Sequence, residues 1–143
     1  MKNRFVYYNP NPKLRRRKNG TPYAWSRCDC SVRAVACALN ISWEDAYTQL
    51  CAAGAVIYDM PDTKEAIGHV LCNNGFEYVK LGRPERGMRR NTVSETAKLV
   101  SSSPSKTIVA NCTGHVVCIK DGKYYDTGDS GDMCVFSYWR KKS

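Results

Sequence analysis

The chain has 143 residues, of which 43% are hydrophobic, which is enough for one buried core and does not call for a second domain. Its net charge of +9 suggests nucleic-acid binding until the charges are located. Residues 1–20 hold seven Lys or Arg and no acid, residues 140–142 hold three more, and the 12 basic and 13 acidic residues between them leave a net charge of minus one. The body is therefore close to neutral and the ends are basic, which excludes a uniformly basic domain.

The N-terminal residues lack the apolar run of about 7 to 15 residues that a secretory signal needs, and no stretch approaches the roughly 18 apolar residues of a membrane span. We therefore expect an intracellular protein that does not enter a membrane. The eight cysteines would suggest disulfides in a secreted chain. In a reducing compartment we expect them to be mostly small buried apolar groups.

Residues 1–27 contain Asn9-Pro10-Asn11-Pro12 and a basic run, so we expect a basic N-terminal arm, extended or looped, ahead of a single domain over residues 28–143. Helical spacing of apolar residues predicts a first helix over Cys30–Leu39 with Asp29 as its N-cap. Capping signals and glycines place a second helix from Ser42 to Gly54 and a third from Asp62 to Gly75.

In the later part of the chain, the spacing of apolar residues changes from helical periodicity to the alternation of strands. Residues 76–81 alternate like a strand, residues 82–91 form a basic loop with four arginines, and Thr92 with Glu95 caps a short helix that ends near Ser101. Strands are predicted over residues 107–111, 115–119, 123–126 and 134–139, with Asp121-Gly122 as a two-residue hairpin turn. Helices followed by an antiparallel sheet indicate an α+β fold, with N-terminal helices packed on a C-terminal sheet.

Cys30 is the candidate nucleophile. A free thiol, with a pKa of about 8.5, is little ionised at neutral pH, and a helix N-terminus favours the thiolate through the macrodipole and unpaired N–H groups. Cys30 opens the first predicted helix, whereas Cys28 lies two residues upstream in the loop. The sequence therefore favours Cys30 over Cys28 as a reactive thiol.

His115 is the candidate base. The chain has two histidines, and His69 lies inside the third predicted helix, where a structural or surface role is favoured. His115 follows Gly114 at the start of an apolar strand, where a polar ring has no evident structural purpose. A base delivered from a sheet to a thiol at a helix N-terminus is the layout of a cysteine hydrolase.

The hairpin supplies a candidate third residue. With a two-residue turn, Lys120 pairs with Lys123, and His115 and Asp126 then lie on one face of the sheet as diagonal neighbours. A carboxylate there would orient the imidazole and stabilise the imidazolium. A three-residue loop would shift the register by one and bring Asp129 to that position instead.

These residues carry a family resemblance. The segments Asp29-Cys30-Ser31-Val32-Arg33-Ala34, Gly114-His115-Val116-Val117-Cys118-Ile119-Lys120-Asp121-Gly122 and Tyr125-Asp126-Thr127 resemble small papain-like cysteine peptidases of phage and bacterial genomes, over roughly residues 28–139. The resemblance implies a papain-like fold with Cys30 as nucleophile, His115 as base and Asp126 as orienting acid. It further implies a peptide or protein substrate, no cofactor, and a cytoplasmic location in a bacterium or phage-infected host.

One residue departs from the family pattern. Such peptidases usually carry a glutamine about six residues before the cysteine to complete the oxyanion hole, and Ala24 stands there. The backbone N–H of Cys30 would serve with a second donor, for which Trp25, Ser26 and Asn111 are the candidates. Arg33 is interpreted as a structural ion-pair partner.

The sequence allows two other interpretations. Cys28-Asp29-Cys30 suggests zinc, but the other cysteines are too scattered for a second ligand pair, and strand alternation places Cys118 on the face opposite His115, so we expect no metal site. The second alternative is a catalytically inactive papain-like binding module. Its basic residues would bind nucleic acid or an acidic protein, chiefly through Arg15, Arg16, Arg17 and Lys18.

Overall fold

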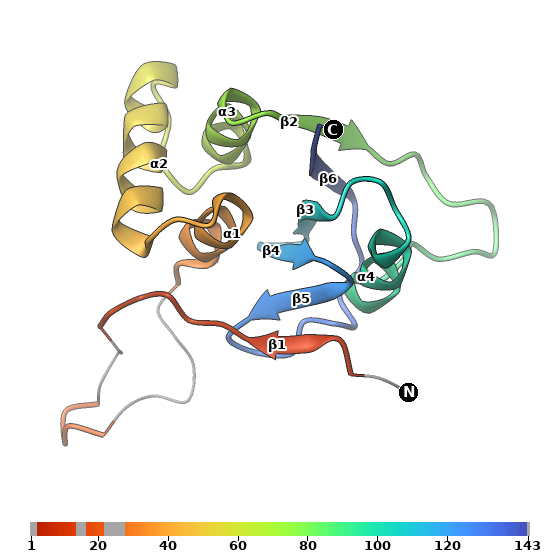
Figure 1. The fold of residues 1–143 in the computed structure, drawn as a ribbon, viewed down its shortest axis with the longest axis horizontal. Helices are drawn as coiled ribbons and strands as arrows, with labels where there is room; N and C mark the ends of the chain where they lie inside the picture. The colour runs from red at the N-terminus through yellow and green to blue at the C-terminus, as the bar shows by residue number, and fades with distance from the viewer. Residues whose placement is uncertain (1–2, 14–16, 22–27, 143) are drawn as a thin grey trace.

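The computed structural model describes residues 3–13, 17–21 and 28–142, which form an α+β fold with four helices and one six-stranded mixed sheet (Figure 1). The strand order is β1-β5-β4-β3-β6-β2. Only β1 and β5 pair in parallel among these neighbours. The elements are β1 Phe5–Tyr7, α1 Cys30–Leu39, α2 Trp43–Ile57, α3 Lys64–Asn73, β2 Phe76–Lys80, α4 Val93–Ser101, β3 Thr107–Cys112, β4 His115–Lys120, β5 Lys123–Asp126 and β6 Ser137–Lys141.

The N-terminal segment contributes a strand, so the prediction of an arm or loop is wrong at Phe5–Tyr7. Val6 pairs with Tyr125 in the parallel β1–β5 ladder, and the ring centroids of Phe5 and Tyr124 lie 5.7 Å apart. Phe5 thereby gains an aromatic partner on β5 and is partly buried, whereas Tyr7 stays exposed. The prediction of an antiparallel sheet is wrong for the same reason, whereas the strand predicted over residues 76–81 is present as β2 at the other edge of the sheet.

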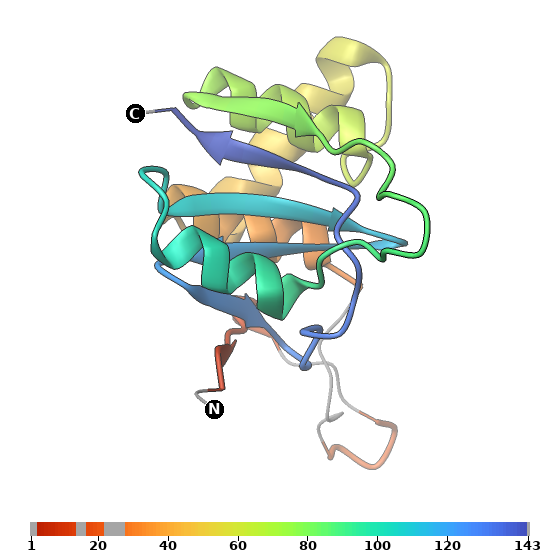
Figure 2. The same ribbon diagram turned by 90° about the vertical axis from the view of Figure 1, so that its right-hand side faces the viewer.

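The helices cover both faces of the sheet rather than one (Figures 1 and 2). Helices α1, α2 and α3 lie on one face, with α1 packed directly against β4, and α4 lies on the opposite face. Residues 31–38 of α1 are all buried, as expected for a helix enclosed between the sheet and two other helices. The small side chains Ala34, Ala36 and Ala38 permit this close approach.

The face that α4 covers has its own core. Val93, Ala97 and Val100 of α4 pack over alternate residues of β3 and β4, among them Ile108 and Val117. The intervening strand residues, such as Val109 and Cys118, pack on the α1 side. Strand alternation thus separates the two cores. In the described part of the chain, none of the helices combines the length and apolar character needed to traverse a bilayer.

The structure extends or shifts several predicted element ends. Helix α2 continues past Gly54 and ends at Ile57. Its C-cap residue, Tyr58, has a left-handed φ of 58°. Gly54 is required where the chain doubles back, because a Cβ there would lie 2.6 Å from the carbonyl oxygen of Asp59. Helix α3 is capped by Thr63, whose side chain accepts from Ala66 N–H, and not by Asp62.

The last strand also differs from its prediction, since β6 begins at Ser137 rather than Cys134. Cys134 forms only an isolated bridge with Thr92, and Val135 N–H donates to Asn91. The predicted β4–β5 hairpin is confirmed, with Lys120 opposite Lys123. Asp121 and Gly122 have φ of 52° and 82°, the left-handed pair that a type I′ turn requires.

The predicted capping box of α4 is present and offers a test of local stability. Thr92 accepts from Glu95 N–H through its hydroxyl, and the Glu95 carboxylate accepts from Thr92 N–H. We expect Thr92→Ala to lower the free energy of unfolding by about 1 kcal/mol in urea titrations, because one helix N–H loses its acceptor. Thr92→Ser, which keeps the hydroxyl, should stay close to the parent; equal losses in both variants would contradict this account.

Candidate active site

Cys30 lies at the first position of α1 and borders a cleft of about 690 Å³. The cleft is formed where the N-terminus of α1 meets the adjoining ends of β3, β4 and β6, and it is also lined by Asn111, His115 and Phe136. The thiol is partly exposed, so a ligand in the cleft can reach it. The predicted start of α1 is confirmed, and Cys28 lies exposed two residues before it.

His115 is the first residue of β4 and stands between the thiol and a carboxylate. Its Nε2 atom lies 2.6 Å from Oδ2 of Asp126. The Cys30 thiol interacts with the same imidazole ring. Because Nε2 is engaged by Asp126, the Nδ1 atom is the ring nitrogen left to exchange a proton with Cys30.

Asp126 ends β5 on the strand face that the sequence predicted. The two-residue turn fixes the register, and His115 and Asp126 meet as diagonal neighbours. Asp129 is directed elsewhere: its Oδ1 accepts from the Tyr124 hydroxyl at 2.5 Å and from Gly131 N–H at 2.9 Å. The alternative of Asp129 as the partner of His115 is therefore wrong.

A buried ion-pair network holds Asp126 in place. Arg33, 6% exposed, reaches Asp126 Oδ1 through Nη1 at 2.7 Å and Asp29 Oδ1 through Nε at 2.9 Å. This confirms Arg33 as a structural ion-pair partner. Ser130 Oγ and the Thr127 N–H also donate to Asp126, so each of its oxygens has two partners in the described part of the chain.

Asp29 is the N-cap residue of α1, as predicted, but its side chain makes no capping hydrogen bond to the helix. Its carboxylate instead accepts from Arg33, from Trp43 Nε1 at 2.9 Å and from Asn11 Nδ2 at 3.1 Å. Leaving the buried Arg33 guanidinium without a carboxylate would cost more free energy than leaving one helix N–H without a side-chain acceptor. The Asp29 carboxylate therefore pairs with Arg33 instead of capping α1.

These contacts shift the pKa values of the site in a consistent direction. Burial alone would raise the pKa of Cys30, but the His115 ring, the Val116 N–H and the charges of His115 and Arg33 outweigh it and lower that pKa. Hydrogen bonds to Asp126 and Cys30 raise the pKa of His115 to about 9. Burial is likewise outweighed at Asp126, where His115, Ser130 and Arg33 hold the pKa far below its usual range. Both shifts favour the charged forms, the thiolate of Cys30 and the imidazolium of His115.

No family model, curated protein or solved structure matches the chain.

The structure brings together Cys30, His115 and Asp126, but it leaves the second oxyanion donor unassigned. Asn111 lines the cleft, and its Nδ2 donates to Ser137 Oγ at 2.9 Å. Trp25 and Ser26 lie outside the described residues, as does Ala24.

Other candidate residues lie away from the cleft or outside the described part of the chain. His69 is partly buried on α3, as expected for a structural histidine. Arg17 and Lys18 are exposed in a short turn, whereas Arg15 and Arg16 lie outside the described residues.

Three contributors to the site were not predicted: Ser130 as a donor to Asp126, Phe136 as a wall of the cleft, and Asp126 as the partner of Arg33. Ser130 could have been found from its spacing, since it follows Asp126 by four residues in a turn-rich segment. The other two depend on tertiary contacts across the sheet and carry no local signal.

Proposed function

We propose that the chain is a cysteine hydrolase of papain-like type that cleaves an amide or related acyl bond, as a peptidase or isopeptidase. The observation that carries the proposal is the continuous chain of contacts from Cys30 through His115 to Asp126, with the carboxylate locked by Arg33. A buried arginine that fixes the position of Asp126 is expected if Asp126 must hold the His115 ring in one orientation for catalysis. A cysteine without a catalytic role would not require an oriented imidazole beside it.

The proposed reaction has two steps. The Cys30 thiolate adds to the carbonyl carbon, and collapse of the tetrahedral adduct breaks the carbon–nitrogen bond while the His115 imidazolium protonates the leaving amine. A water then attacks the thioester as His115 accepts its proton, and the carboxylic acid leaves with Cys30 returned as thiolate and His115 as imidazolium. Asp126 keeps the ring oriented and stabilises its positive charge throughout.

Selective alkylation tests the proposal. With limiting iodoacetamide at pH 6.5 and peptide mapping, we expect Cys30 to react faster than the other seven cysteines, because it is the thiol held as thiolate by an imidazolium. His115→Ala should slow alkylation of Cys30 by about tenfold or more, and Cys30→Ala should leave the other sites unchanged. Equal rates at all eight cysteines, or no effect of His115→Ala, would refute the proposal.

The pH profile gives a second readout. The pKa of Cys30 is lowered, so its thiolate persists on the acid side of an ordinary thiol, and its alkylation rate should fall only at lower pH. In His115→Ala the main contact that lowers this pKa is lost, and the profile should shift to higher pH. Superimposable profiles in parent and variant would show that the imidazole does not activate the thiol.

The alternative of nucleic-acid binding through the basic N-terminal residues remains a proposal of lower rank. Tyr8 packs edge-on against Tyr125 and does not offer a free ring for base stacking. Its N–H also donates to the Asp126 carbonyl at 2.8 Å, so deleting residues 1–20 would disturb the site as well as remove charge. A clean test replaces Arg15, Arg16, Arg17 and Lys18 with Gln; unchanged affinity for a single-stranded oligonucleotide at low salt would remove this alternative.

A further inference from the structure

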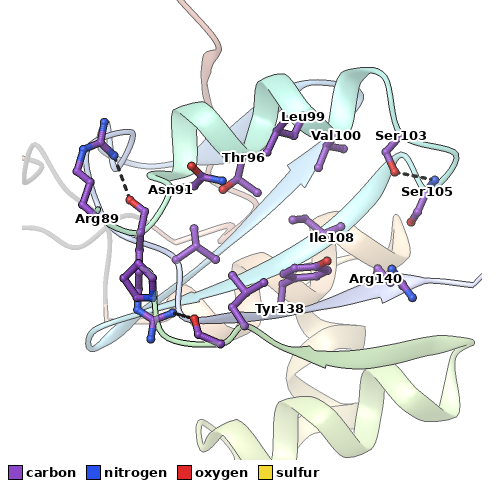
Figure 3. A pocket seen from close by; sticks show the side chains of 15 residues that line it. Arg89, Asn91, Thr96, Leu99, Val100, Ser103, Ser105, Ile108, Tyr138 and Arg140 are labelled. Carbon is purple, nitrogen blue, oxygen red and sulfur yellow. Dashed lines mark hydrogen bonds between the residues drawn. The ribbon is translucent and has the colours of Figure 1, made fainter. Parts of the chain in front are cut away.

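A second hollow lies on the α4 side of the sheet and shares no lining residue with the cleft around Cys30. Its volume is about 490 Å³, and it lies between α4, β3, β6 and the basic loop of residues 82–91 (Figure 3). Leu99 and Val100 of α4 face Ile108 and Tyr138 of the strands across it. Hollows of this size with mainly apolar walls are typical of binding sites.

The apolar wall reaches the protein surface. Leu99 is 59% exposed although it stands beside buried residues of the α4 core. A large exposed leucine at the mouth of an apolar hollow is a candidate anchor point for a partner side chain.

Basic side chains border the hollow. Arg89 lies at the end formed by the loop, and Arg140 lies at the opposite end (Figure 3). Arg90, the next residue of the loop, also lines the hollow. The Arg90 guanidinium covers the Phe136 ring at 4.7 Å and donates to the Gly82 carbonyl, so it is held in place without a carboxylate partner in the contacts described. Arginines fixed in this way at the rim of an apolar hollow can receive carboxylates.

A neighbouring hollow of about 400 Å³ continues the groove. It shares Ser103, Ser105 and Arg140 with the first and adds Lys141 and Lys142. Five basic residues of the described part of the chain line the two hollows, and Glu95 and Glu77 pair with two of them, which leaves an excess of three positive charges. The five are Arg89, Arg90, Arg140, Lys141 and Lys142. The groove is therefore complementary to an acidic ligand.

We propose that this groove binds an extended peptide segment of a partner protein in which large apolar side chains are flanked by carboxylates. The apolar side chain enters the hollow beside Leu99, and the carboxylates pair with the basic residues at its rim. This inference does not depend on the activity of Cys30, because the groove and the cleft are separate.

Other occupants fit the lining less well. Single-stranded nucleic acid needs several exposed aromatic faces for its bases, but Tyr138 is the single aromatic residue among the described residues that line the hollow, and Arg90 covers the neighbouring Phe136 ring. A fatty-acyl chain needs a continuous apolar channel, whereas the second hollow is lined by Ser103, Ser105, Lys141 and Lys142. A peptide that carries both apolar and acidic side chains can fill the apolar hollow beside Leu99 and also pair with the basic residues of the neighbouring hollow.

Fluorescence anisotropy with the full chain tests the proposal. The probe is a fluorescein-labelled hexapeptide with two central leucines between pairs of glutamates. We expect saturable binding that weakens about tenfold in Leu99→Asp and about two- to fivefold in Arg140→Gln. Val56→Asp, at an exposed apolar position of α2, and Lys13→Gln, which removes one exposed positive charge elsewhere, are the matched controls and should bind as the parent does.

Several outcomes would overturn the proposal. Among them are the absence of saturable binding, equal weakening in the control variants, and equal binding of a probe whose glutamates are replaced by lysines. Tighter competition by dodecanoate or by a thymidine oligonucleotide than by the unlabelled peptide would instead identify a lipid or nucleic-acid site. Sedimentation that shows a dimer abolished by Leu99→Asp would identify a second copy of the chain as the occupant.

Discussion

Loss of either Cys30 or His115 is expected to abolish nearly all hydrolysis of an activated acyl substrate. With p-nitrophenyl acetate, the parent should form a thioester on Cys30 that mass spectrometry detects, and Cys30→Ala should lower the rate on the order of a thousandfold. His115→Ala should lower it by about 10²- to 10⁴-fold, because the thiolate and the proton donor are lost together. The reason is structural: one ring contacts both the thiol and Asp126.

The exposed thiols Cys28 and Cys72 would also react with an activated ester, so the measurement is made in a background in which both are Ser. His69→Ala is the matched control, since His69 lies on α3 outside the cleft lining. It should retain the activity of the background protein. Thioester formation at other cysteines with the same burst, or an equal loss in His69→Ala, would contradict the assignment of Cys30 and His115.

The three proposed catalytic residues could be predicted because each carries a local signal. Cys30 is recognisable from the start of an apolar helix, and His115 from a polar ring that opens an apolar strand. The Asp121-Gly122 turn sets the hairpin register, which in turn brings Asp126 beside His115. Local rules therefore determine this part of the site.

The support of the site could not be predicted, because it depends on contacts between distant segments. Arg33 and Asp126 are 93 residues apart in the chain, and only the packing of α1 on the sheet brings them together. The position of Asp29 before α1 indicates side-chain capping, but its carboxylate accepts hydrogen bonds from Arg33 and Trp43 instead.

The structure of the N-terminal segment also depends on contacts with a distant part of the chain, so it could not be predicted from the sequence. Prolines and a basic run favour a loop, and a three-residue strand gives too short an alternation to detect. Its parallel pairing with β5 places Tyr8 N–H on the Asp126 carbonyl, and Asn11 on Asp29. Residues that were expected to be an appendage thus hold the backbone of Asp126 and the carboxylate of Asp29.

The buried network around Arg33 leads to the largest expected effect on stability. We expect Arg33→Met to lower the free energy of unfolding by about 3–5 kcal/mol in urea titrations at pH 7, because Asp126 and Asp29 lose a cation while they remain buried. Arg33→Lys should lie between parent and Arg33→Met, since an ammonium lacks the planar fork that reaches both carboxylates. Arg140→Gln, which breaks an exposed ion pair with Glu77, should be close to the parent.

A double variant separates loss of charge balance from loss of packing. If the cost of Arg33→Met arises from an uncompensated carboxylate, adding Asp126→Asn should cost less in that background than in the parent, because an amide needs no buried cation. Additive losses would show that Arg33 acts mainly through the packing of its aliphatic stem. In that case Arg33 would not be what keeps Asp126 ionised, and the orientation of His115 would rest on the Ser130 and Thr127 contacts to Asp126 and on the β4–β5 register.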